Sequence, residues 1–150
     1  PGLVTYNEVY CWKSTPLFAR EARFAITILH ELAHMWFGNY ITMNWWDDLW
    51  LNESFATFIS YLACMLGTNI DPRYINATWI GFFNDKKSGY SEDEKSTTHS
   101  VCFPINDTDQ SQSSFDSIVY NKGSSILKQI YYFVGHENFG KGLANYFGKY

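Results

Sequence analysis

The stretch from Thr27 to Trp36 constrains the fold of this chain more than any other, because it carries two histidines one helical turn apart. Its sequence is Thr-Ile-Leu-His-Glu-Leu-Ala-His-Met-Trp, so His30 and His34 are separated by four positions. Residues four apart lie on one face of an α-helix, and both imidazoles can therefore reach the same ion. Glu31 points at a different angle and is better placed beside a water on that ion than on the ion itself. The spacing is typical of zinc-binding helices in metalloproteases.

A zinc site that performs chemistry needs a third protein ligand, with the fourth position left for water. Glu53 follows His34 with eighteen residues between them, in an aromatic-rich segment that we expect to form a second helix. A His-x-x-x-His pair alone is more often a surface or core pair, but the intervening Glu31 and the later carboxylate make the combination far more specific. We predict one Zn²⁺ per chain, bound by His30, His34 and Glu53, with Glu31 as the general base.

The two segments that carry these residues resemble a known family, the aminopeptidase N-like zinc peptidases or gluzincins. The resemblance rests on His-Glu-Leu-Ala-His-Met-Trp-Phe-Gly-Asn at 30–39 and on Trp-Trp-Asp-Asp-Leu-Trp-Leu-Asn-Glu-Ser-Phe-Ala at 45–56, and it runs through most of the 150 residues. It implies a thermolysin-like catalytic domain that removes N-terminal residues from peptide substrates with a metal-activated water. The implied enzyme is an exopeptidase similar to the membrane alanyl aminopeptidases.

A residue that stabilises the oxyanion of the reaction cannot be chosen by composition, because the chain has 11 tyrosines. The segment Ser-Ile-Val-Tyr-Asn-Lys-Gly-Ser-Ser at 117–125 resembles the Tyr-x-Lys-Gly segment of the same family. In that family the tyrosine hydroxyl faces the metal and hydrogen-bonds the oxyanion, so the resemblance implies this role for Tyr120. Without the resemblance, the ordinary interpretation is a tyrosine packed in the core.

One family motif, Gly-x-Met-Glu-Asn, binds the free amino group of the substrate. By the resemblance it would end immediately before Pro1, so we expect this clamp and the flanking domains to lie outside the 150 residues. Two other interpretations therefore stay open beside the aminopeptidase. One is an epoxide hydrolase similar to the leukotriene-processing branch of the family, and the other is a zinc-binding fragment that is inactive without the rest of its own chain.

Several further residues near these motifs receive no ligand role. Three of them could orient a ligand histidine but are expected to cap helices or face solvent: Asp47, Asp48 and Asn52. His99 resembles a loop position that the family often fills with histidine, but we expect a solvated side chain. We expect the pair Trp45 and Trp46 to belong to the core rather than to a substrate platform.

Composition narrows the class of protein. Hydrophobic residues make up 46% and aromatic residues 19%, enough for one domain with a substantial core, and the net charge of −4 gives no electrostatic footprint for nucleic acid. The three cysteines, Cys11, Cys64 and Cys102, do not have the spacing of a disulfide framework, and Cys64 is expected to be buried. We see no stretch apolar enough for a membrane span. The compartment stays open, with a cytoplasmic location favoured.

Periodicity predicts a mainly α fold with a small β edge (α+β), in one unit over residues 1–150. Alternation predicts a strand over Gly2–Val9, and polar composition predicts loops over 88–100 and 107–114. Apolar steps of three and four predict helices over about 16–37, 52–66, 72–87, 115–134 and 137–150.

Overall fold

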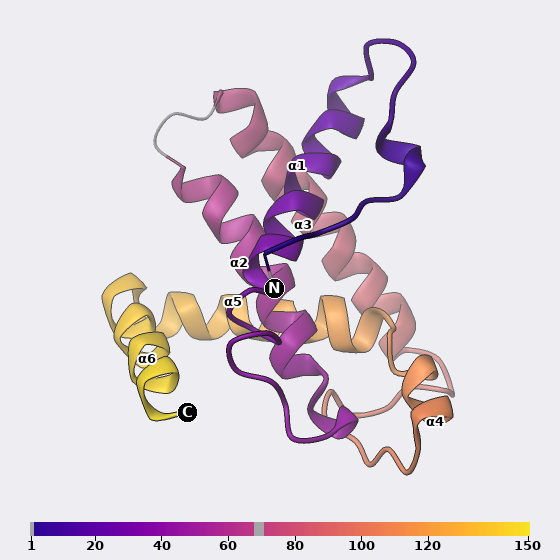
Figure 1. Cartoon of the computed structure of the whole chain (residues 1–150), viewed down its shortest axis with the longest axis vertical. Coiled ribbons are helices and arrows are strands. Elements are labelled where there is room, and N and C mark those ends of the chain that lie inside the picture. Colours follow the sequence, from indigo (N-terminus) through magenta and orange to yellow (C-terminus); the bar gives the residue numbers. More distant parts are fainter. Residues whose placement is uncertain (1, 68–70) are drawn as a thin grey trace.

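The protein is built from helices joined by loops, as the computed structural model shows for residues 2–67 and 71–150 (Figure 1). The elements are, in chain order, η1 (Glu8–Tyr10), α1 (Phe18–Ala33), η2 (Trp46–Asp48), α2 (Trp50–Leu66), α3 (Pro72–Asp93), α4 (Thr108–Ser113), η3 (Ile118–Lys122), α5 (Gly123–Val134) and α6 (His136–Lys149). Here η1 and η2 are 3₁₀-helices, whereas η3 is a π-helix. The prediction of a mainly helical fold is confirmed.

The predicted strand over Gly2–Val9 was wrong, because no strand forms within the residues that the structure describes. This segment runs without regular structure into η1 and is fastened to α1 by aromatic contacts. The rings of Tyr6 and Tyr10 lie 5.6 and 4.4 Å from that of Phe24. Alternating residues make a strand only where a neighbouring strand offers a hydrogen-bond ladder, and here helix α1 is the neighbour.

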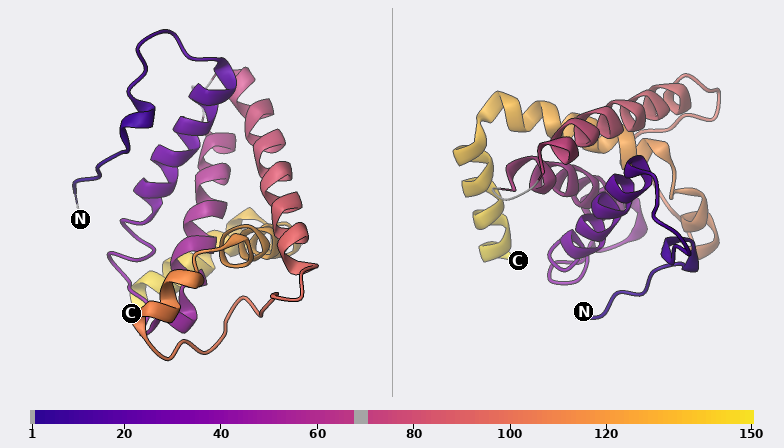
Figure 2. Two further views of the ribbon diagram at one scale, coloured as in Figure 1. Left: turned by 90° about the vertical axis from the view of Figure 1, so that its right-hand side faces the viewer. Right: turned by 90° about the horizontal axis from the view of Figure 1, so that it is seen from above.

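Helices α1, α2 and α3 lie side by side, and α5 crosses their lower ends (Figures 1 and 2). The main core forms where these four helices meet, around buried side chains that are mostly apolar: Ile26, Phe58, Tyr61, Leu62, Cys64, Phe82, Leu127 and Tyr131. Burying a large apolar side chain of this kind contributes about 1.5–3 kcal/mol. Since α2 contacts α1, α3, η3 and α5, it is the central element of the fold.

The central position of α2 explains its apolar composition. The segment Trp46–Leu66 is, by length and mean hydropathy alone, sufficient for a membrane span, although the sequence patterns indicated none. In the structure 56% of its most apolar window is buried inside the protein, and it carries the buried Glu53 and Ser54. Its hydropathy is therefore accounted for by packing against the other helices.

A polar cluster ties helices α1, α2 and α3 together on one side. Arg23 of α1 donates to the hydroxyl of Tyr61 on α2 and to the carboxylate of Asp85 on α3, both at 3.0 Å. The Tyr61 hydroxyl in turn donates to Asp85 at 2.6 Å. These contacts add polar links to the apolar packing between the three helices and help to fix their relative positions.

Three predicted element boundaries differ from the structure. Helix α1 ends at Ala33 rather than near Phe37, and Gly38 follows with a φ of 127°. Helix α3 continues to Asp93, through residues predicted as loop, because its buried Gly89 packs against the backbone of η3. The polar stretch 107–114 contains helix α4, which begins where the Asp107 carboxylate accepts from the backbone N–H of Gln110.

The predicted helix over 115–134 is interrupted by the π-helix η3. At this point the hydroxyl of Ser54 on α2 donates to the carbonyl of Val119 at 2.5 Å. A side chain inserted into the hydrogen-bond ladder is a known cause of such irregularities. Gly123 follows directly, and a Cβ at this position would lie only 2.0 Å from the Ser54 Oγ atom. The close approach of α2 to η3 thus depends on a glycine.

We expect Gly123→Ala to lower the free energy of unfolding by about 1–3 kcal/mol, because the new methyl group would overlap Ser54. The same change in a Ser54→Gly background should cost much less, since the overlapping atoms are gone. Gly140→Ala on α6 is the matched control, as a Cβ there meets nothing within 4 Å. It should be neutral or stabilising by up to about 1 kcal/mol. Urea unfolding of the four variants measures this, and an unchanged stability of Gly123→Ala would contradict the account.

Candidate metal centre

Three side chains from two helices converge at one point. His30 stands on the last turn of α1, His34 directly follows this helix as its C-cap residue, and Glu53 stands on the first turn of α2. The Nε2 atoms of the two histidines are 3.0 Å apart, and each lies 3.2 Å from Oε2 of Glu53. The structure therefore brings together the three residues that the sequence predicted as ligands, from positions up to 23 residues apart.

The packing of α1 against α2 brings these side chains into contact. The buried face of α1 includes two alanines, Ala22 and Ala33, and Ala56 of α2 is completely buried. Small side chains at a helix interface allow the two helix axes to approach closely. Glu53 is itself 92% buried, since only 8% of its surface is exposed. A carboxylate so far from water requires polar or charged partners, and here the two imidazoles are those partners.

The orientation of each histidine ring is set by its other nitrogen. The Nδ1 atom of His34 lies 2.9 Å from the carbonyl oxygen of Phe37. Since a carbonyl only accepts, Nδ1 carries the proton, and in the neutral ring Nε2 has a free lone pair. The Nδ1 atom of His30 faces the hydroxyl of Thr57 at 3.4 Å. Such contacts on the remote nitrogen are the usual way in which proteins orient metal-binding histidines.

The electrostatics of the cluster favour an ionised Glu53. Burial by itself would raise the pKa of this carboxyl, but hydrogen bonds from His30 and His34 outweigh it and lower the pKa to about 2. Burial would likewise lower the pKa of His34, but the hydrogen bond and the charge of Glu53 outweigh burial and raise it. In the metal-free protein the ionised Glu53 therefore favours a proton on the neighbouring His34. A bound cation would replace that proton as the positive partner of the carboxylate.

The donor set and its dimensions fit a zinc ion. Two imidazole nitrogens and one carboxylate oxygen match the ligand types that catalytic zinc sites use. A tetrahedral zinc shell with bonds of about 2.0–2.2 Å has ligand-to-ligand edges of about 3.3–3.6 Å. The triangle of His30, His34 and Glu53 has edges of 3.0–3.2 Å. Only a small outward adjustment of the three side chains would therefore be needed.

A cleft of about 730 Å³ opens beside this triangle. Glu31, His34 and Glu53 form part of its wall. Trp45 and Trp46 also line the cleft, and Trp45 is 43% exposed, so their expected place in the core was wrong. The indole N–H of Trp45 donates to the carbonyl of Ile105 at 2.6 Å, which holds this ring at the surface. A polar contact to a distant loop cannot be inferred from local apolar composition.

Gly38 allows the chain to turn closely past the ligands. Its φ of 127° is a conformation that other residues rarely adopt. A Cβ at Gly38 would lie 3.3 Å from the side chain of Asn52 and 3.6 Å from Nδ1 of His34. Asn52 therefore packs against this turn and also lines the cleft, and no contact of Asp47 or Asp48 with the histidine rings is found among the described residues.

Tyr120 reaches the same region from η3. Its ring lies parallel to that of His30, with 6.0 Å between centroids and 20° between planes. Burial raises the pKa of the Tyr120 hydroxyl, and the nearby carboxylates of Glu53 and Glu31 raise it further. The hydroxyl therefore keeps its proton at neutral pH and is available as a donor. The structure thus places Tyr120 beside the predicted metal ligands, about 90 residues after His30.

Some participating groups were not predicted from the sequence. The carbonyl of Phe37 carries no side-chain signal, whereas Thr57 lies four positions after Glu53 and could have been found as a neighbour on the same helix face. His99 was predicted to be solvated but its Nε2 atom lies 2.7 Å from Oδ2 of Asp116, and its ring packs on Phe103 with centroids 4.0 Å apart.

Comparison with known proteins agrees with this geometry. The family model described as "Peptidase family M1 domain" matches residues 1–150. The chain is similar to "Aminopeptidase N" of Streptomyces lividans, with 43% identity over 99% of this chain. It is also 43% identical to "Leucyl aminopeptidase" of Saccharolobus solfataricus and 38% identical to "Alanine/arginine aminopeptidase" of Saccharomyces cerevisiae, again over 99% of this chain.

The family model covers the whole chain, so the chain belongs to the peptidase family M1. Members of this family are zinc metallopeptidases. The resemblance noted in the sequence is therefore confirmed at the level of the family. The chain spans only 17–19% of the length of these three relatives, which are much longer proteins.

The ion pair within the triangle predicts a pH-dependent stability of the metal-free protein. The contribution of Glu53, whose pKa is lowered from 4.5, is complete above that pH and is lost as the pH falls toward about 2. The contribution of His34, whose pKa is raised from 6.5, is complete below 6.5 and is lost as the pH rises through the higher value. We therefore expect Glu53→Gln to cost about 1–3 kcal/mol, mostly between pH 4.5 and 6.5.

Urea unfolding in the presence of a chelator, repeated across this pH range, measures the effect. Glu137→Gln at the exposed start of α6 is the control, and its effect on the free energy of unfolding should not depend on pH in this way. A difference between Glu53→Gln and the parent that does not change with pH would contradict the ion pair.

Proposed function

We propose that residues 1–150 form the catalytic core of a zinc-dependent aminopeptidase with a thermolysin-like arrangement, in which His30, His34 and Glu53 bind the metal. The observation that carries the proposal is the convergence of two Nε2 atoms and one carboxylate oxygen within 3.0–3.2 Å of one another. The family supports it, as do the names of the relatives, all three of which are aminopeptidases.

The proposed chemistry is hydrolysis of a peptide bond by water. Zinc in this position would lower the pKa of a water toward ~7 and polarise the scissile carbonyl. Glu31 lies on the wall of the cleft, on the same helix as the two histidines but one position from His30. Its carboxylate would take the proton of the attacking water and deliver it to the leaving amine.

Tyr120 would stabilise the negative charge that develops on the carbonyl oxygen. Its hydroxyl keeps its proton, as argued above, and its ring stands beside that of His30. A preorganised donor of this kind acts most strongly in the transition state, in a site from which water is largely excluded. The role rests on the position of the ring beside the ligands and on the resemblance of its segment to the family motif.

The substrate we propose is a peptide, held in the cleft of about 730 Å³ beside the ligands. The cleft is lined by apolar side chains, such as those of Met35, Trp46 and Phe115, and by polar ones. An extended peptide presents both apolar side chains and polar backbone groups, and this lining suits both. We propose further that residues outside these 150 bind the free amino group of the substrate. The remainder of a longer chain is therefore a partner of this unit.

In the complete protein we expect Glu31→Gln to retain one zinc per chain but to lose turnover by at least about 10²-fold, because the amide cannot accept a proton. His34→Ala should instead lower the zinc content well below one per chain, since a ligand is removed. Metal analysis and a peptidase assay on the same preparations separate the two effects. Normal turnover of Glu31→Gln, or full zinc in His34→Ala, would reject the corresponding assignment.

Tyr120→Phe removes only a hydroxyl, so we expect zinc content and stability to stay unchanged. The loss of one oxyanion donor typically lowers kcat by about 10²–10³-fold, while KM changes little when the contact is made only in the transition state. Tyr132→Phe on α5, where the ring is largely exposed, is the matched control and should be silent. Steady-state kinetics measure both. If Tyr120→Phe is as active as the parent, another group stabilises the oxyanion.

A further inference from the structure

The ring of Tyr120 stands in the middle of a π-helix, and this form of helix needs support from outside. Element η3 covers Ile118–Lys122, directly before α5. π-helices are rare, occur mostly as single turns within α-helices and are found frequently at functional sites. A less stable backbone form persists where surrounding contacts hold it. The contacts at the two ends of η3 therefore indicate which residues hold this turn in place.

Asp116 holds the beginning of η3 with one carboxylate oxygen and its backbone carbonyl. Its Oδ1 atom accepts from the backbone N–H groups of Ile118 at 2.9 Å and of Val119 at 3.1 Å. Its carbonyl oxygen accepts from the N–H of Tyr120 at 3.0 Å. The first three amide groups of the turn are thus all satisfied by one residue, which fixes where the turn begins.

The second carboxylate oxygen of Asp116 is held by His99. The Nε2 atom of His99 lies 2.7 Å from Oδ2 of Asp116, and its Nδ1 atom lies 2.7 Å from the carbonyl oxygen of Ser100. Both ring nitrogens of His99 are therefore within hydrogen-bond distance of an oxygen atom. The His99 ring also lies against that of Phe103, with 4.0 Å between centroids and a tilt of 46°. With both nitrogens and the ring in contact, His99 fixes the rotation of the Asp116 carboxylate.

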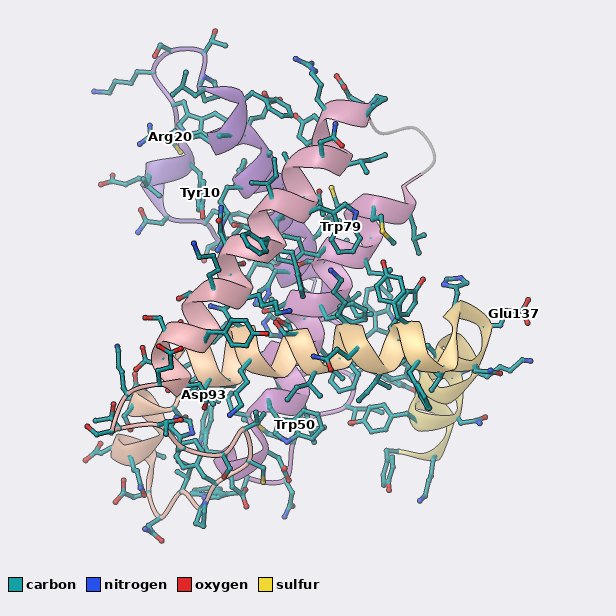
Figure 3. All side chains as sticks on the ribbon, turned by 180° about the vertical axis from the view of Figure 1, so that it is seen from behind. Tyr10, Arg20, Trp50, Trp79, Asp93 and Glu137 are labelled. Atoms are coloured by element: carbon teal, nitrogen blue, oxygen red, sulfur yellow. The ribbon has the colours of Figure 1, made fainter. Side chains whose placement is uncertain are left out.

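The end of η3 is held by the same short segment of chain. The Nζ atom of Lys122 donates to Oδ1 of Asp93 at 2.6 Å, and the hydroxyl of Thr98 donates to the same oxygen at 2.8 Å. Asp93 is the last residue of α3, and Figure 3 shows it where α3 meets the ribbon that leads into α5. Thr98 and His99 are neighbours, so the end of α3 and the loop that follows it together support both ends of the turn that carries Tyr120.

We propose that His99 and Asp116 are positioning residues that hold the turn η3 so that the Tyr120 hydroxyl faces the metal centre. The inference rests on the role proposed for Tyr120 above. It gives His99 a function in turnover although its side chain contacts neither the metal ligands nor the cleft. The pair acts through backbone amides and not through the tyrosine ring itself, so its loss shifts the turn without removing the hydroxyl.

The test is a double-mutant cycle in the complete, zinc-loaded protein. His99→Leu removes the pair, and Asp116→Asn keeps an acceptor for the two amides but loses the charged partner. Each should lower kcat by about 10- to 100-fold, with KM changed less than about twofold, because a small displacement of a catalytic group has effects of this size. In a Tyr120→Phe background His99→Leu should have no further effect. His136→Leu, at the exposed start of α6, is the control and should leave kcat unchanged.

Amide hydrogen exchange provides a readout that does not depend on activity. In His99→Leu the amides of Ile118, Val119 and Tyr120 should exchange faster, while those of α1 and α2 stay as protected as in the parent. Unchanged exchange at these three amides overturns the proposal, as does a loss of kcat in His99→Leu that is equally large with and without the Tyr120 hydroxyl. If Tyr120→Phe alone is fully active, the role of Tyr120 has failed, and exchange still decides whether the pair holds the turn.

Discussion

The contact between the end of α1 and the beginning of α2 is the constraint on which the rest of the structure depends. It places a 92% buried carboxylate, Glu53, against two imidazoles. Without His30 and His34, burial of that charge would be strongly unfavourable, because a desolvated carboxylate needs compensation. The hydrogen bonds of the triangle therefore help hold the two helices together and also create a site that attracts a cation. Structure and proposed function share the same three side chains.

The position of Tyr120, the proposed oxyanion donor, relative to the proposed metal ligands is set by residues that are adjacent to them in the sequence. Ser54 directly follows Glu53 on α2, and its hydroxyl binds the carbonyl of Val119, the residue before Tyr120. Gly123 permits this approach, because any side chain there would overlap Ser54. His99 in the loop after α3 and Asp93 at the end of α3 then support the same turn through Asp116 and Lys122. Tyr120 is thus held between α2 and that loop, on backbone that an uninterrupted α-helix would not provide.

Sequence patterns sufficed for the features that depend on local geometry. The spacing of His30 and His34 predicted a shared helical face, and apolar periodicity placed the main helices to within a few residues, except at the ends of α1 and α3. The site triangle was predictable because two ligands lie on one helical turn and the third begins the next long helix. The role of each of these residues in binding and catalysis stays a prediction.

The features that the sequence patterns did not predict depend on contacts between segments that are far apart in the chain. The strand predicted over Gly2–Val9 does not form, because an alternating pattern carries no information about which element packs against the segment. The π-helix lies where the hydroxyl of Ser54 binds the carbonyl of Val119, and the end of α3 lies where Gly89 packs against η3. His99 was taken for a solvated residue because its partner Asp116 lies 17 positions away. A polar pair of that separation leaves no periodic signal in the sequence.

The most direct test of the central claim is an anomalous diffraction measurement at the zinc absorption edge, on crystals of the complete protein grown with zinc. The account predicts one anomalous peak inside the triangle formed by Nε2 of His30, Nε2 of His34 and the carboxylate of Glu53. The Tyr120 side chain should lie on the open side of that peak. A well-ordered structure with these side chains in place and no peak between them, or with the metal bound elsewhere, would contradict the account.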